Sequence, residues 1–485
     1  MSATSDVRML ANFVGGEFVA PAGGDYLDDV ASESGEVIAR VPRSGAADVQ
    51  RAVAAARGAF GSWSRAPMAE RADLCDAVST RIASRAEELA ELESLDTGKT
   101  VRTAREVDIP RAVANFRFFA GALRHQSTSA HEMDGALNYT LRRPLGVCAL
   151  VTPWNLPLYL LSWKAAPAIA MGNGVVAKPS ELTPLTAHAL AEIFREVGAP
   201  PGVFNLVHGY GHEAGAALVE HPDVAAVSFT GGTVTGAKVA AAAAPRFKKL
   251  SLELGGKNAS VVFADCDFDA TVEGVVRAGF LNQGQVCLCG SRVLVERPLY
   301  ERFTAALVAR VARMQVGDRR HARTELGALV SHSHRDKVES HLALARQEGG
   351  VIRCGGTRPV LPPPLDRGAF LSPAVITGLS PASRTATEEI FGPVVTVHPF
   401  DAEDEAIALA NGVEYGLAAS VWTNDLKRAH RVSAALDVGM VWVNTWLLRD
   451  LRVPFGGAKA SGVGREGGWL SLEFFSEAKN VCIKL

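Results

Sequence analysis

Cys287 has surroundings that suit a nucleophile. It ends the polar segment 282–287, Asn-Gln-Gly-Gln-Val-Cys, which follows an apolar stretch. An accessible thiol that gives up its proton can attack a carbonyl carbon and form a covalent intermediate. The alternative is a small buried residue, which is the usual state of a free cysteine. We assign that state to the cysteines at 75, 148, 266, 354 and 482, and the sequence leaves the role of Cys289 open.

Five polar segments each follow a short apolar run that is typical of a buried strand. Ligands of open α/β sheets bind beyond the carboxyl ends of parallel strands, so we expect these segments to form one site. The alternative for any one of them is an ordinary α/β loop, since such loops are rich in Gly and Pro. The segments are Thr152-Pro153-Trp154-Asn155, Lys178-Pro179-Ser180-Glu181, Gly209-Tyr210-Gly211, Thr230-Gly231-Gly232-Thr233 and Gly255-Gly256-Lys257.

One of these segments has the composition of a phosphate cradle. Phosphate binding needs backbone N–H groups and close approach, hence glycine before a helix, and 230–233 followed by Gly236 meets that need. No GxGxxG pattern is present; Gly209 and Gly211 followed by Gly215 have the wrong spacing and indicate a turn. Gly98-Lys99-Thr100 lacks the upstream glycine of a P-loop.

The elements that must position these residues alternate between strands and helices. Apolar runs predict strands at 146–151, 175–177, 203–207, 224–229 and 250–254, and then at 260–263, 292–296, 394–400, 418–422 and 440–444. Helices are expected at 158–171, 185–197, 268–281, 299–311, 403–411 and 426–436, with Ser44 capping an earlier one. The pattern predicts an α/β fold with two doubly wound domains joined near Gly255-Gly256.

Composition narrows the class of protein. The 485 residues carry a formal net charge of -2, with 48% hydrophobic and 21% charged residues, so we expect a globular protein with no nucleic-acid partner. The most apolar stretch, 156–176, is interrupted by Pro157, Lys164 and Pro167, so no membrane partner is expected. Seven cysteines without a CxxC pair indicate neither a disulfide framework nor a metal site. Because we expect neither disulfide bonds nor a signal peptide, the sequence favours the cytoplasm as the location.

Six segments together resemble the aldehyde dehydrogenase superfamily in their order and spacing, from about residue 12 to the C-terminus. They are Pro153-Trp154-Asn155, Lys178-Pro179-Ser180-Glu181, Phe229-Thr230-Gly231-Gly232, Leu252-Glu253-Leu254-Gly255-Gly256-Lys257, Phe280 to Cys287, and Glu389-Ile390-Phe391-Gly392-Pro393. The resemblance implies oxidation of an aldehyde to a carboxylic acid through a cysteine thiohemiacetal and thioester. Cys287 would attack, Asn155 would hold the oxyanion, and Glu253 would activate the hydrolytic water.

The same resemblance implies NAD as cofactor. Lys178 and Glu181 would hold the adenosine ribose, and a carboxylate there disfavours a 2′-phosphate. Gly232 stands where many members have serine, which leaves the backbone cradle intact. The full set of expected cofactor-binding residues is Thr152, Pro153, Trp154, Lys178, Ser180, Glu181, Gly211, Phe229, Thr230, Gly231, Gly232, Thr233, Leu254, Gly255, Glu389 and Phe391.

Three further segments resemble the 2-aminomuconate and 2-hydroxymuconate 6-semialdehyde dehydrogenases within that superfamily. They are 108–111, 154–159 and 444–450. The resemblance implies that Arg111 and Arg449 bind a substrate carboxylate, for which a guanidinium fork is suited, and that Leu158 contacts substrate. The alternative is that both arginines are surface or ion-pair residues. The sequence does not separate the 2-amino from the 2-hydroxy substrate.

The resemblance also implies a domain plan and a homodimer or homotetramer. An NAD-binding domain would comprise 1–122 and 144–255, a catalytic domain 256–455, and an oligomerisation arm 123–143 and 467–485. Three alternatives stay open: a dehydrogenase for another aldehyde, an enzyme that passes the thioester to coenzyme A, and a catalytically silent binding protein on the same fold. Glu253 argues against the second, and the joint presence of Asn155, Glu253 and Cys287 against the third.

Overall fold

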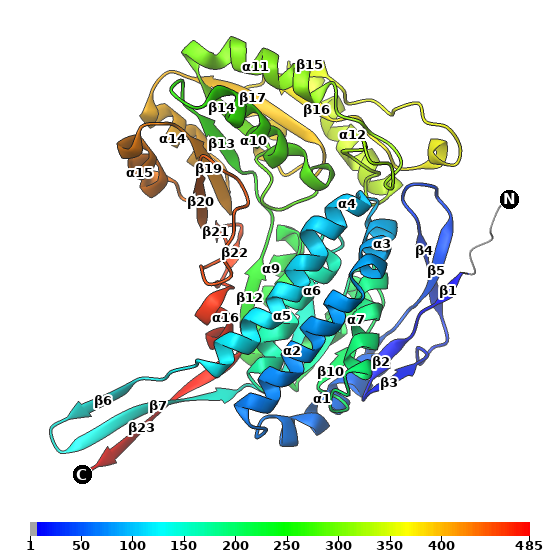
Figure 1. Ribbon diagram of the computed structural model, residues 1–485, viewed down its shortest axis with the longest axis vertical. Helices are drawn as coiled ribbons and strands as arrows, with labels where there is room; N and C mark the ends of the chain where they lie inside the picture. Colours follow the sequence, from blue (N-terminus) through cyan, green and yellow to red (C-terminus); the bar gives the residue numbers. More distant parts are fainter. Residues whose placement is uncertain (1–6) are drawn as a thin grey trace.

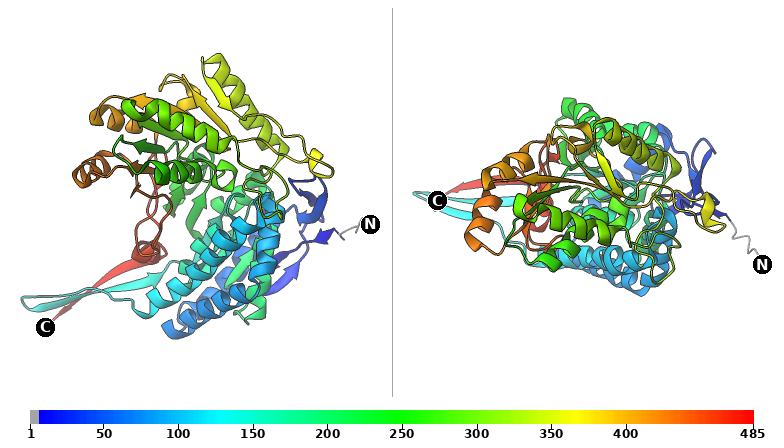
Figure 2. Two further views of the ribbon diagram at one scale, coloured as in Figure 1. Left: turned by 45° about the horizontal axis from the view of Figure 1, so that its top comes forward. Right: turned by 90° about the horizontal axis from the view of Figure 1, so that it is seen from above.

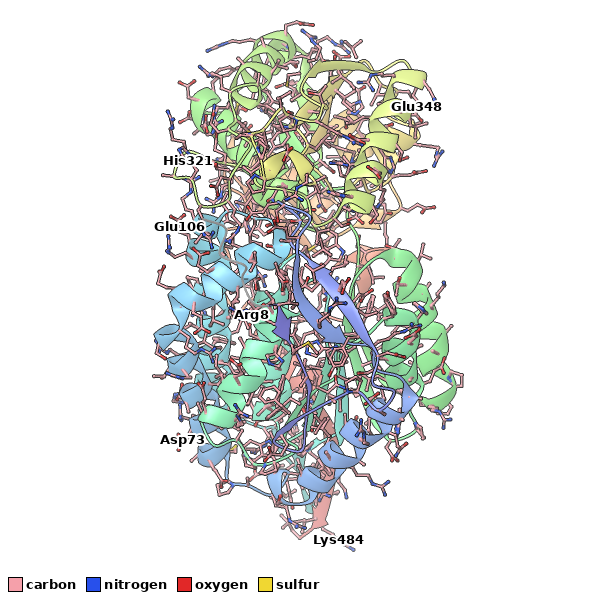
Figure 3. The ribbon with its side chains drawn as sticks, turned by 90° about the vertical axis from the view of Figure 1, so that its right-hand side faces the viewer. Arg8, Asp73, Glu106, His321, Glu348 and Lys484 are labelled. Carbon is pink, nitrogen blue, oxygen red and sulfur yellow. The ribbon has the colours of Figure 1, made fainter. Side chains whose placement is uncertain are left out.

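Two lobes stacked along the longest axis form the molecule, and a thin arm leaves the lower lobe (Figure 1). The structure is a computed structural model that describes residues 7–485. Residues 1–6 lie outside the described residues. They include the start of the predicted segment 1–122 and of the stretch in which no signal peptide is expected. Figure 3 places Asp73 in the lower lobe, His321 and Glu348 in the upper lobe, and Glu106 near the level where the lobes meet.

The lower lobe contains an eight-stranded sheet in the order β22-β12-β11-β8-β9-β10-β2-β3. Its five central strands are parallel, as the apolar runs predict. The chain runs from β8 to β9 and β10 on one side, then returns to β11 and β12 on the other, so β8 marks the switch point where α/β sheets bind ligands. The strands are β2 Asn12–Val14, β3 Glu17–Val19, β8 Val147–Val151, β9 Gly174–Lys178, β10 Phe204–Leu206, β11 Val224–Thr230, β12 Lys249–Glu253 and β22 Gly462–Val463. Beside it, β1 Arg8–Met9, β5 Val37–Pro42 and β4 Tyr26–Val30 form a separate three-stranded sheet.

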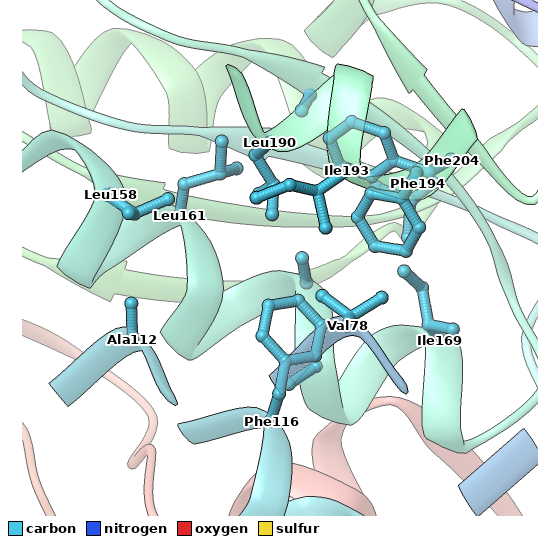
Figure 4. Packing of buried hydrophobic residues seen from close by; sticks show 14 of the residues in the cluster. Val78, Ala112, Phe116, Leu158, Leu161, Ile169, Leu190, Ile193, Phe194 and Phe204 are labelled. Carbon is cyan, nitrogen blue, oxygen red and sulfur yellow. The ribbon is translucent and has the colours of Figure 1, made fainter. Parts of the chain in front are cut away.

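Both faces of this sheet are covered, because successive strand residues point to opposite sides. Cys148 and Leu150 belong to the core under α6 and α7, whereas Val147 and Ala149 belong to the core under α1, α8 and α9. Figure 4 shows the first of these cores in close packing. The lobe's helices are α1 Ala46–Trp63, α2 Met68–Ser84, α3 Ala86–Thr97, α4 Val101–Thr103, α5 Ile109–Arg124, α6 Pro157–Ala170, α7 Leu185–Glu196, α8 Ala216–Glu220 and α9 Thr233–Ala243.

The start of α1 differs from the prediction that Ser44 caps it. The capping position is Gly45, whose N–H donates to the Asp48 carboxylate at 3.2 Å. Ser44 is buried, and its hydroxyl accepts a hydrogen bond from Asn12 Nδ2 at 2.8 Å. A contact 32 residues away along the chain therefore outweighs the local capping preference of serine.

The upper lobe contains a seven-stranded sheet in the order β15-β16-β17-β14-β13-β19-β20. The sequence predicts five of these strands but neither β15 nor β16, and it does not predict α12, whose sequence is strongly polar. The strands are β13 Ala259–Val262, β14 Arg292–Glu296, β15 Val351–Cys354, β16 Ala374–Thr377, β17 Val394–Phe400, β19 Ala418–Trp422 and β20 Met440–Val443. The helices are α10 Phe268–Phe280, α11 Arg297–Val311, α12 His332–Gln347, α13 Arg384–Thr387, α14 Glu403–Asn411 and α15 Leu426–Ala435. The short strands β18 Tyr415–Gly416 and β21 Ala458–Lys459 pair with each other.

The arm is an antiparallel sheet of β6 Ala130–Met133, β7 Ala136–Pro144 and β23 Ser476–Lys484, which projects from the body in every view (Figures 1 and 2). Both segments predicted for the arm begin with helical residues. Leu123 is the next-to-last residue of α5 and is fully buried in the core, and the chain from 468 first forms α16 Gly468–Phe474, which packs on α6. Across the described residues, no helix combines the length and apolarity needed to cross a membrane.

Candidate active site

A cavity of about 400 Å³ lies where the two lobes meet. The lower lobe contributes the carboxyl ends of β8, β9, β11 and β12, and the upper lobe contributes Cys287, the start of α12 and the segment around Glu389. The cavity brings together these predicted residues: Thr152, Pro153, Trp154, Asn155, Lys178, Ser180, Glu181, Phe229, Thr230, Gly231, Gly232, Glu253, Leu254, Gly255, Cys287, Glu389 and Phe391.

Two predicted cofactor-binding residues do not line this cavity. Gly211 is exposed and opens a single π-helical turn, η2 Gly211–Gly215. Thr233 is the first residue of α9, between the cavity-lining Gly232 and Thr235, but its hydroxyl donates to Ala460 O at 3.3 Å. The structure therefore favours the backbone of Thr233, and not its side chain, as a binding group.

Four lining residues were missed by the sequence analysis: Val151, Thr235, His334 and Lys337. His334 and Lys337 are three residues apart in the first turns of α12, so they face the same side of that helix. That spacing is a usable signal only once the helix itself is predicted, and the mostly polar sequence of α12 hides the helix. His334 Nε2 donates to Phe391 O at 2.7 Å, which assigns its tautomer.

Cys287 and Glu253 interact at this cavity. Burial and the neighbouring Glu253 carboxylate raise the pKa of the Cys287 thiol well above its usual range, so the resting thiol is protonated. Burial raises the pKa of Glu253 to about 7, and the nearby thiol opposes part of that rise. Neither carboxylate oxygen of Glu253 has a hydrogen-bond partner within residues 7–485. A carboxylate with free oxygens and a pKa near neutrality can accept a proton from the thiol or from water.

Asn155 is held so that part of its amide is free. The residue is 4% exposed, and its Nδ2 donates one hydrogen bond, to Gln285 O at 2.9 Å. A side-chain amide has two N–H groups, so the second can donate to an oxyanion on a carbon bound to Cys287. The loop that carries Cys287 is tightly wound, since Asn282 and Gln283 both have positive φ.

The Gly255-Gly256 segment lies so close to Glu389 and to Cys287 that neither glycine has room for a side chain. A Cβ on Gly255 would lie 2.4 Å from Glu389 Oε2, and one on Gly256 would lie 2.7 Å from Cys287 O. The N–H of Gly256 donates to Glu389 Oε1 at 2.8 Å. Close approach of three chain segments is therefore the reason for the Gly255-Gly256 pair.

Aromatic side chains form one wall of the cavity. Trp154 contacts Phe391 edge to face with ring centroids 5.3 Å apart, and His334 with centroids 5.0 Å apart. Phe391 has φ 61°, an unusual value for a bulky residue, and the hydrogen bond from His334 fixes it there. Burial lowers the pKa of His334 to about 4, so this imidazole stays neutral.

Lys178 and Glu181 form an ion pair at the same cavity. Lys178 follows the buried run of β9 and is 3% exposed, and its Nζ lies 3.2 Å from Glu181 Oε2. Burial is the larger influence on Lys178 and lowers its pKa, while Glu181 acts in the opposite direction. The pair offers both a donor and an acceptor, which is the set needed to bind vicinal hydroxyl groups.

Arg111 and Arg449 meet at a second, wider cleft of about 1000 Å³. Arg449 Nη1 donates to the Tyr159 hydroxyl at 2.6 Å, and its guanidinium lies 4.1 Å from the ring centre of Phe455 and 5.2 Å from that of Trp163. Arg111 lies 5.7 Å from the ring centre of Tyr159. One phenol ring therefore touches both arginines that the sequence analysis selected.

Arg449 has no carboxylate partner among the described residues. Its Nη2 is buried with no hydrogen-bond partner in that part of the chain. The adjacent Asp450 pairs with Arg452 instead, at 2.6 Å. A half-buried guanidinium with an unused N–H and no counter-ion is a site for an anionic ligand, whereas an ion-pair residue would be neutralised.

The prediction that Leu158 contacts substrate is wrong. Its side chain is fully buried and packs in the core with Leu161, as Figure 4 shows. Leu158 is the second residue of α6, a helix that is buried on all sides, so its proximity in sequence to Asn155 does not bring its side chain to the cavity.

Comparison with known proteins agrees with this geometry. The model of the aldehyde dehydrogenase family matches residues 18–481. The chain is 48% identical to a 2-hydroxymuconic semialdehyde dehydrogenase of Pseudomonas sp. (strain CF600), covering 99% of this chain and 100% of that protein. It is 49% identical to a 2-aminomuconic 6-semialdehyde dehydrogenase of Pseudomonas sp., covering 99% of both chains. A crystal structure of a Staphylococcus aureus betaine aldehyde dehydrogenase in complex with NAD⁺ superposes with a TM-score of 0.95 at 39% identity, covering 98% of this chain and 94% of that one.

Proposed function

The chain belongs to the aldehyde dehydrogenase family, and from that premise we propose that it oxidises a carboxylate-bearing semialdehyde to the acid with NAD. The observation that carries the substrate class is Arg449, whose half-buried guanidinium has no acidic partner within the described residues. The relatives named for 2-hydroxymuconic and 2-aminomuconic semialdehydes support these two compounds as candidate substrates.

The residues at the first cavity fit NAD. The cavity reaches the N-terminus of α9, where Gly232 leaves open space and free backbone N–H groups can bind a pyrophosphate. Lys178 and Glu181 are suited to the ribose hydroxyls, and the Glu181 carboxylate repels a 2′-phosphate. We assign the nicotinamide half to the side of Glu389, Phe391 and Cys287. When bound, NAD supplies the acceptor for a hydride.

The protein's own residues account for the other steps. Glu253 takes the proton of the Cys287 thiol, and the sulfur forms a bond to the aldehyde carbon. The resulting oxyanion accepts hydrogen bonds from the free N–H of Asn155 and from the backbone N–H of Cys287. After loss of a hydride from that carbon, a thioester is left on Cys287. Glu253 releases that proton to solvent and then removes a proton from water, and the hydroxide adds to the thioester. The carbon–sulfur bond breaks to release the acid, and the Cys287 thiolate takes the proton back from Glu253.

The arm supports a homo-oligomer. Its sheet ends at β23 on one side and β6 on the other within residues 7–485, so both edges offer backbone groups for pairing. Met133, Ile483 and Leu485 are exposed on these strands or just beyond them. A second copy of the chain would cover them. The seven free cysteines are in keeping with the cytoplasm as the location.

The proposed activity is tested with the purified protein, NAD and 2-hydroxymuconate semialdehyde, beside a neutral aldehyde of similar length. We expect NADH formation with a kcat/KM at least about tenfold higher for the semialdehyde, corresponding to about 1.4 kcal/mol. Cys287→Ala should abolish NADH formation with both compounds while NAD still binds. Equal turnover of the two aldehydes would overturn the substrate class but leave the dehydrogenase chemistry in place.

A further inference from the structure

Lys99 is a buried lysine to which the mechanism above assigns no task. It follows Gly98, the left-handed residue that ends α3, and its side chain is completely buried. Its Nζ donates to Asp108 Oδ2 at 2.8 Å and to the backbone oxygen of Asn155 at 3.0 Å. The ammonium therefore touches the peptide group of the residue that offers its side-chain amide to the oxyanion.

Both ends of Asn155 are fixed by hydrogen bonds. Its backbone oxygen accepts from Lys99 Nζ and from Asn282 Nδ2, the latter at 3.1 Å. Its side-chain Nδ2 donates to Gln285 O at 2.9 Å. The direction of the remaining amide N–H depends on how this peptide is oriented, and within residues 7–485 Lys99 supplies the one charged hydrogen bond to it. Charge-assisted hydrogen bonds are stronger than neutral ones, so the ammonium dominates this orientation.

Asp108 anchors the ammonium on its other side. Asp108 is fully buried and ends η1 Ala104–Asp108, directly before α5 and three residues before Arg111. Glu93 Oε1 lies 3.9 Å from Lys99 Nζ and adds a second buried carboxylate. A charge in such surroundings keeps one position, because moving it away from its partners is costly.

We propose that Lys99 is a positioning residue for the reaction, which holds Asn155 in the orientation that stabilises the oxyanion at Cys287. This rests on the proposed function, since it needs Asn155 as the oxyanion donor. It also accounts for the Gly98-Lys99-Thr100 segment, which resembles a phosphate loop only in composition. The competing account is that Lys99 serves only to balance the buried charges of Glu93 and Asp108.

Lys99→Met separates these accounts, because methionine keeps the chain length and removes the ammonium. We expect kcat to fall about 10- to 100-fold with both the charged and the neutral aldehyde, as for a weakened oxyanion donor. The Kd of NAD and the rate at which iodoacetamide alkylates Cys287 should stay within twofold. A fall in Tm with unchanged kcat per folded protein would overturn the proposal.

Lys248→Met is the matched control. Lys248 is also buried, and its Nζ donates to Val219 O and His221 O, both at 2.6 Å; none of these three residues lines the cavity. Losing a buried ammonium there should lower Tm and leave kcat within twofold. If Lys248→Met lowers kcat as much as Lys99→Met does, the effect is general and the positioning role is excluded.

A double-mutant cycle with Asn155→Ala distinguishes the inference from the proposed function. Asn155→Ala alone should lower kcat about 10²- to 10³-fold, and Lys99→Met should then add less than twofold. If Asn155→Ala leaves kcat unchanged, the proposed oxyanion role fails and the inference with it. If Asn155→Ala lowers kcat and Lys99→Met acts independently of it, the inference alone fails.

If Lys99→Met does not fold, Asp108→Asn tests the same proposal. It keeps an oxygen acceptor of the same size but removes the charge that anchors the ammonium. We expect at least a threefold fall in kcat with the Kd of NAD unchanged. A kcat within twofold of the wild-type value would contradict the proposal.

Discussion

Glu253 and Cys287 shift each other's pKa: burial and the Glu253 carboxylate both raise the pKa of the Cys287 thiol, and the thiol opposes part of the rise that burial causes in the pKa of Glu253. The Cys287 thiol therefore carries its proton before the reaction. In enzymes that place a cation beside the cysteine, the thiolate is formed in advance. Here the thiol proton has to move to Glu253 as the bond to carbon forms. In the proposed mechanism the same carboxylate later activates the hydrolytic water, so we expect Glu253 to set the pH dependence of both steps.

Hydrolysis of the thioester should slow as the pH falls below about 7. Burial raises the pKa of Glu253 to about 7, so below that pH the carboxyl is mostly protonated and cannot accept a proton from water. We expect the deacylation rate to fall tenfold per pH unit below pH 6 and to level off above pH 8. In Glu253→Gln, deacylation should drop about 10²- to 10⁴-fold and lose this pH dependence. Rapid-quench detection of the acyl-enzyme between pH 5.5 and 9 checks both; a Gln variant with normal turnover would exclude Glu253 as the base.

Arg449→Met should discriminate between charged and neutral aldehydes. Loss of a hydrogen-bonded guanidinium should cost about 1.5–3 kcal/mol for a carboxylate-bearing substrate and little for a neutral one. That corresponds to about a 10- to 150-fold rise in KM for the semialdehyde alone. Arg452→Met is the control, because Arg452 lines the same cleft but is exposed and paired with Asp450. Parallel effects of the two substitutions would show that only the general charge of the cleft matters.

Tyr159→Phe should show a weaker form of the same effect. It removes the hydroxyl that accepts from Arg449 at 2.6 Å and keeps the ring beside Arg111. One neutral hydrogen bond contributes about 0.5–1.5 kcal/mol, so KM for the semialdehyde should rise about 2- to 12-fold with kcat maintained. Steady-state kinetics with both aldehydes test this, and a loss of kcat with the neutral aldehyde would mean that the phenol acts elsewhere than on the arginine.

Glu181→Gln should relax the choice between NAD and NADP. Glutamine keeps the size and one acceptor oxygen but removes the negative charge that opposes a 2′-phosphate, and it leaves the cation of Lys178 nearby. We expect the ratio of kcat/KM for NAD to that for NADP to fall by about tenfold, which is about 1.4 kcal/mol. Unchanged discrimination would place the 2′-hydroxyl away from Glu181.

Gly232→Ser and Gly231→Ser form an adjacent pair with opposite expected outcomes. Gly232 is the N-cap of α9 with φ -73° and ψ 148°, and its missing Cβ faces open space. A serine there can cap the helix, so the free energy of unfolding should rise by about 0.3–1 kcal/mol. A Cβ on Gly231 would lie 2.5 Å from the Phe229 ring, so Gly231→Ser should destabilise the protein. Denaturant unfolding measures the free energy of unfolding of both variants. Equal values would contradict the assignment of Gly232 as the N-cap of α9.

Removal of residues 476–485 should convert the protein to monomers. This deletes β23, which pairs with β7 along its whole length, and leaves α16 in place on the body. Sedimentation velocity is expected to show a dimer or tetramer for the full chain and a monomer for the truncated one. An intact oligomer after truncation would assign the interface to another surface.

Local patterns were enough to predict the central strands of the lower sheet. Apolar runs of three to six residues predict all five of them, because both faces of a covered parallel sheet must be apolar. The polar segments after those runs then place Asn155, Lys178 and Gly255 at one sheet edge without further information, whereas Glu253 was selected by the resemblance. The resemblance carried by the same segments led to the aldehyde dehydrogenase family, to which the chain belongs.

Other features depended on contacts that local patterns do not contain. The mostly polar sequence of α12 hid His334 and Lys337, and the sequence of the edge strand β15, Val-Ile-Arg-Cys, does not alternate between apolar and polar residues. Leu158 was misplaced because a residue's distance along the chain from Asn155 says nothing about which way a fully buried helix turns its side chains.

The sequence alone was therefore enough to predict the reactive groups, since the identities of Cys287, Glu253 and Asn155 already limit the chemistry that we propose. The tertiary structure decided which charged groups are neutralised and which are left free. Arg449 contacts Tyr159 from 290 positions away and has no acid beside it in the described chain, whereas Lys99 reaches Asn155 across 56 positions. Charge pairing and desolvation are properties of the folded surroundings, because a charge keeps its full hydration until folding buries it and brings distant groups together.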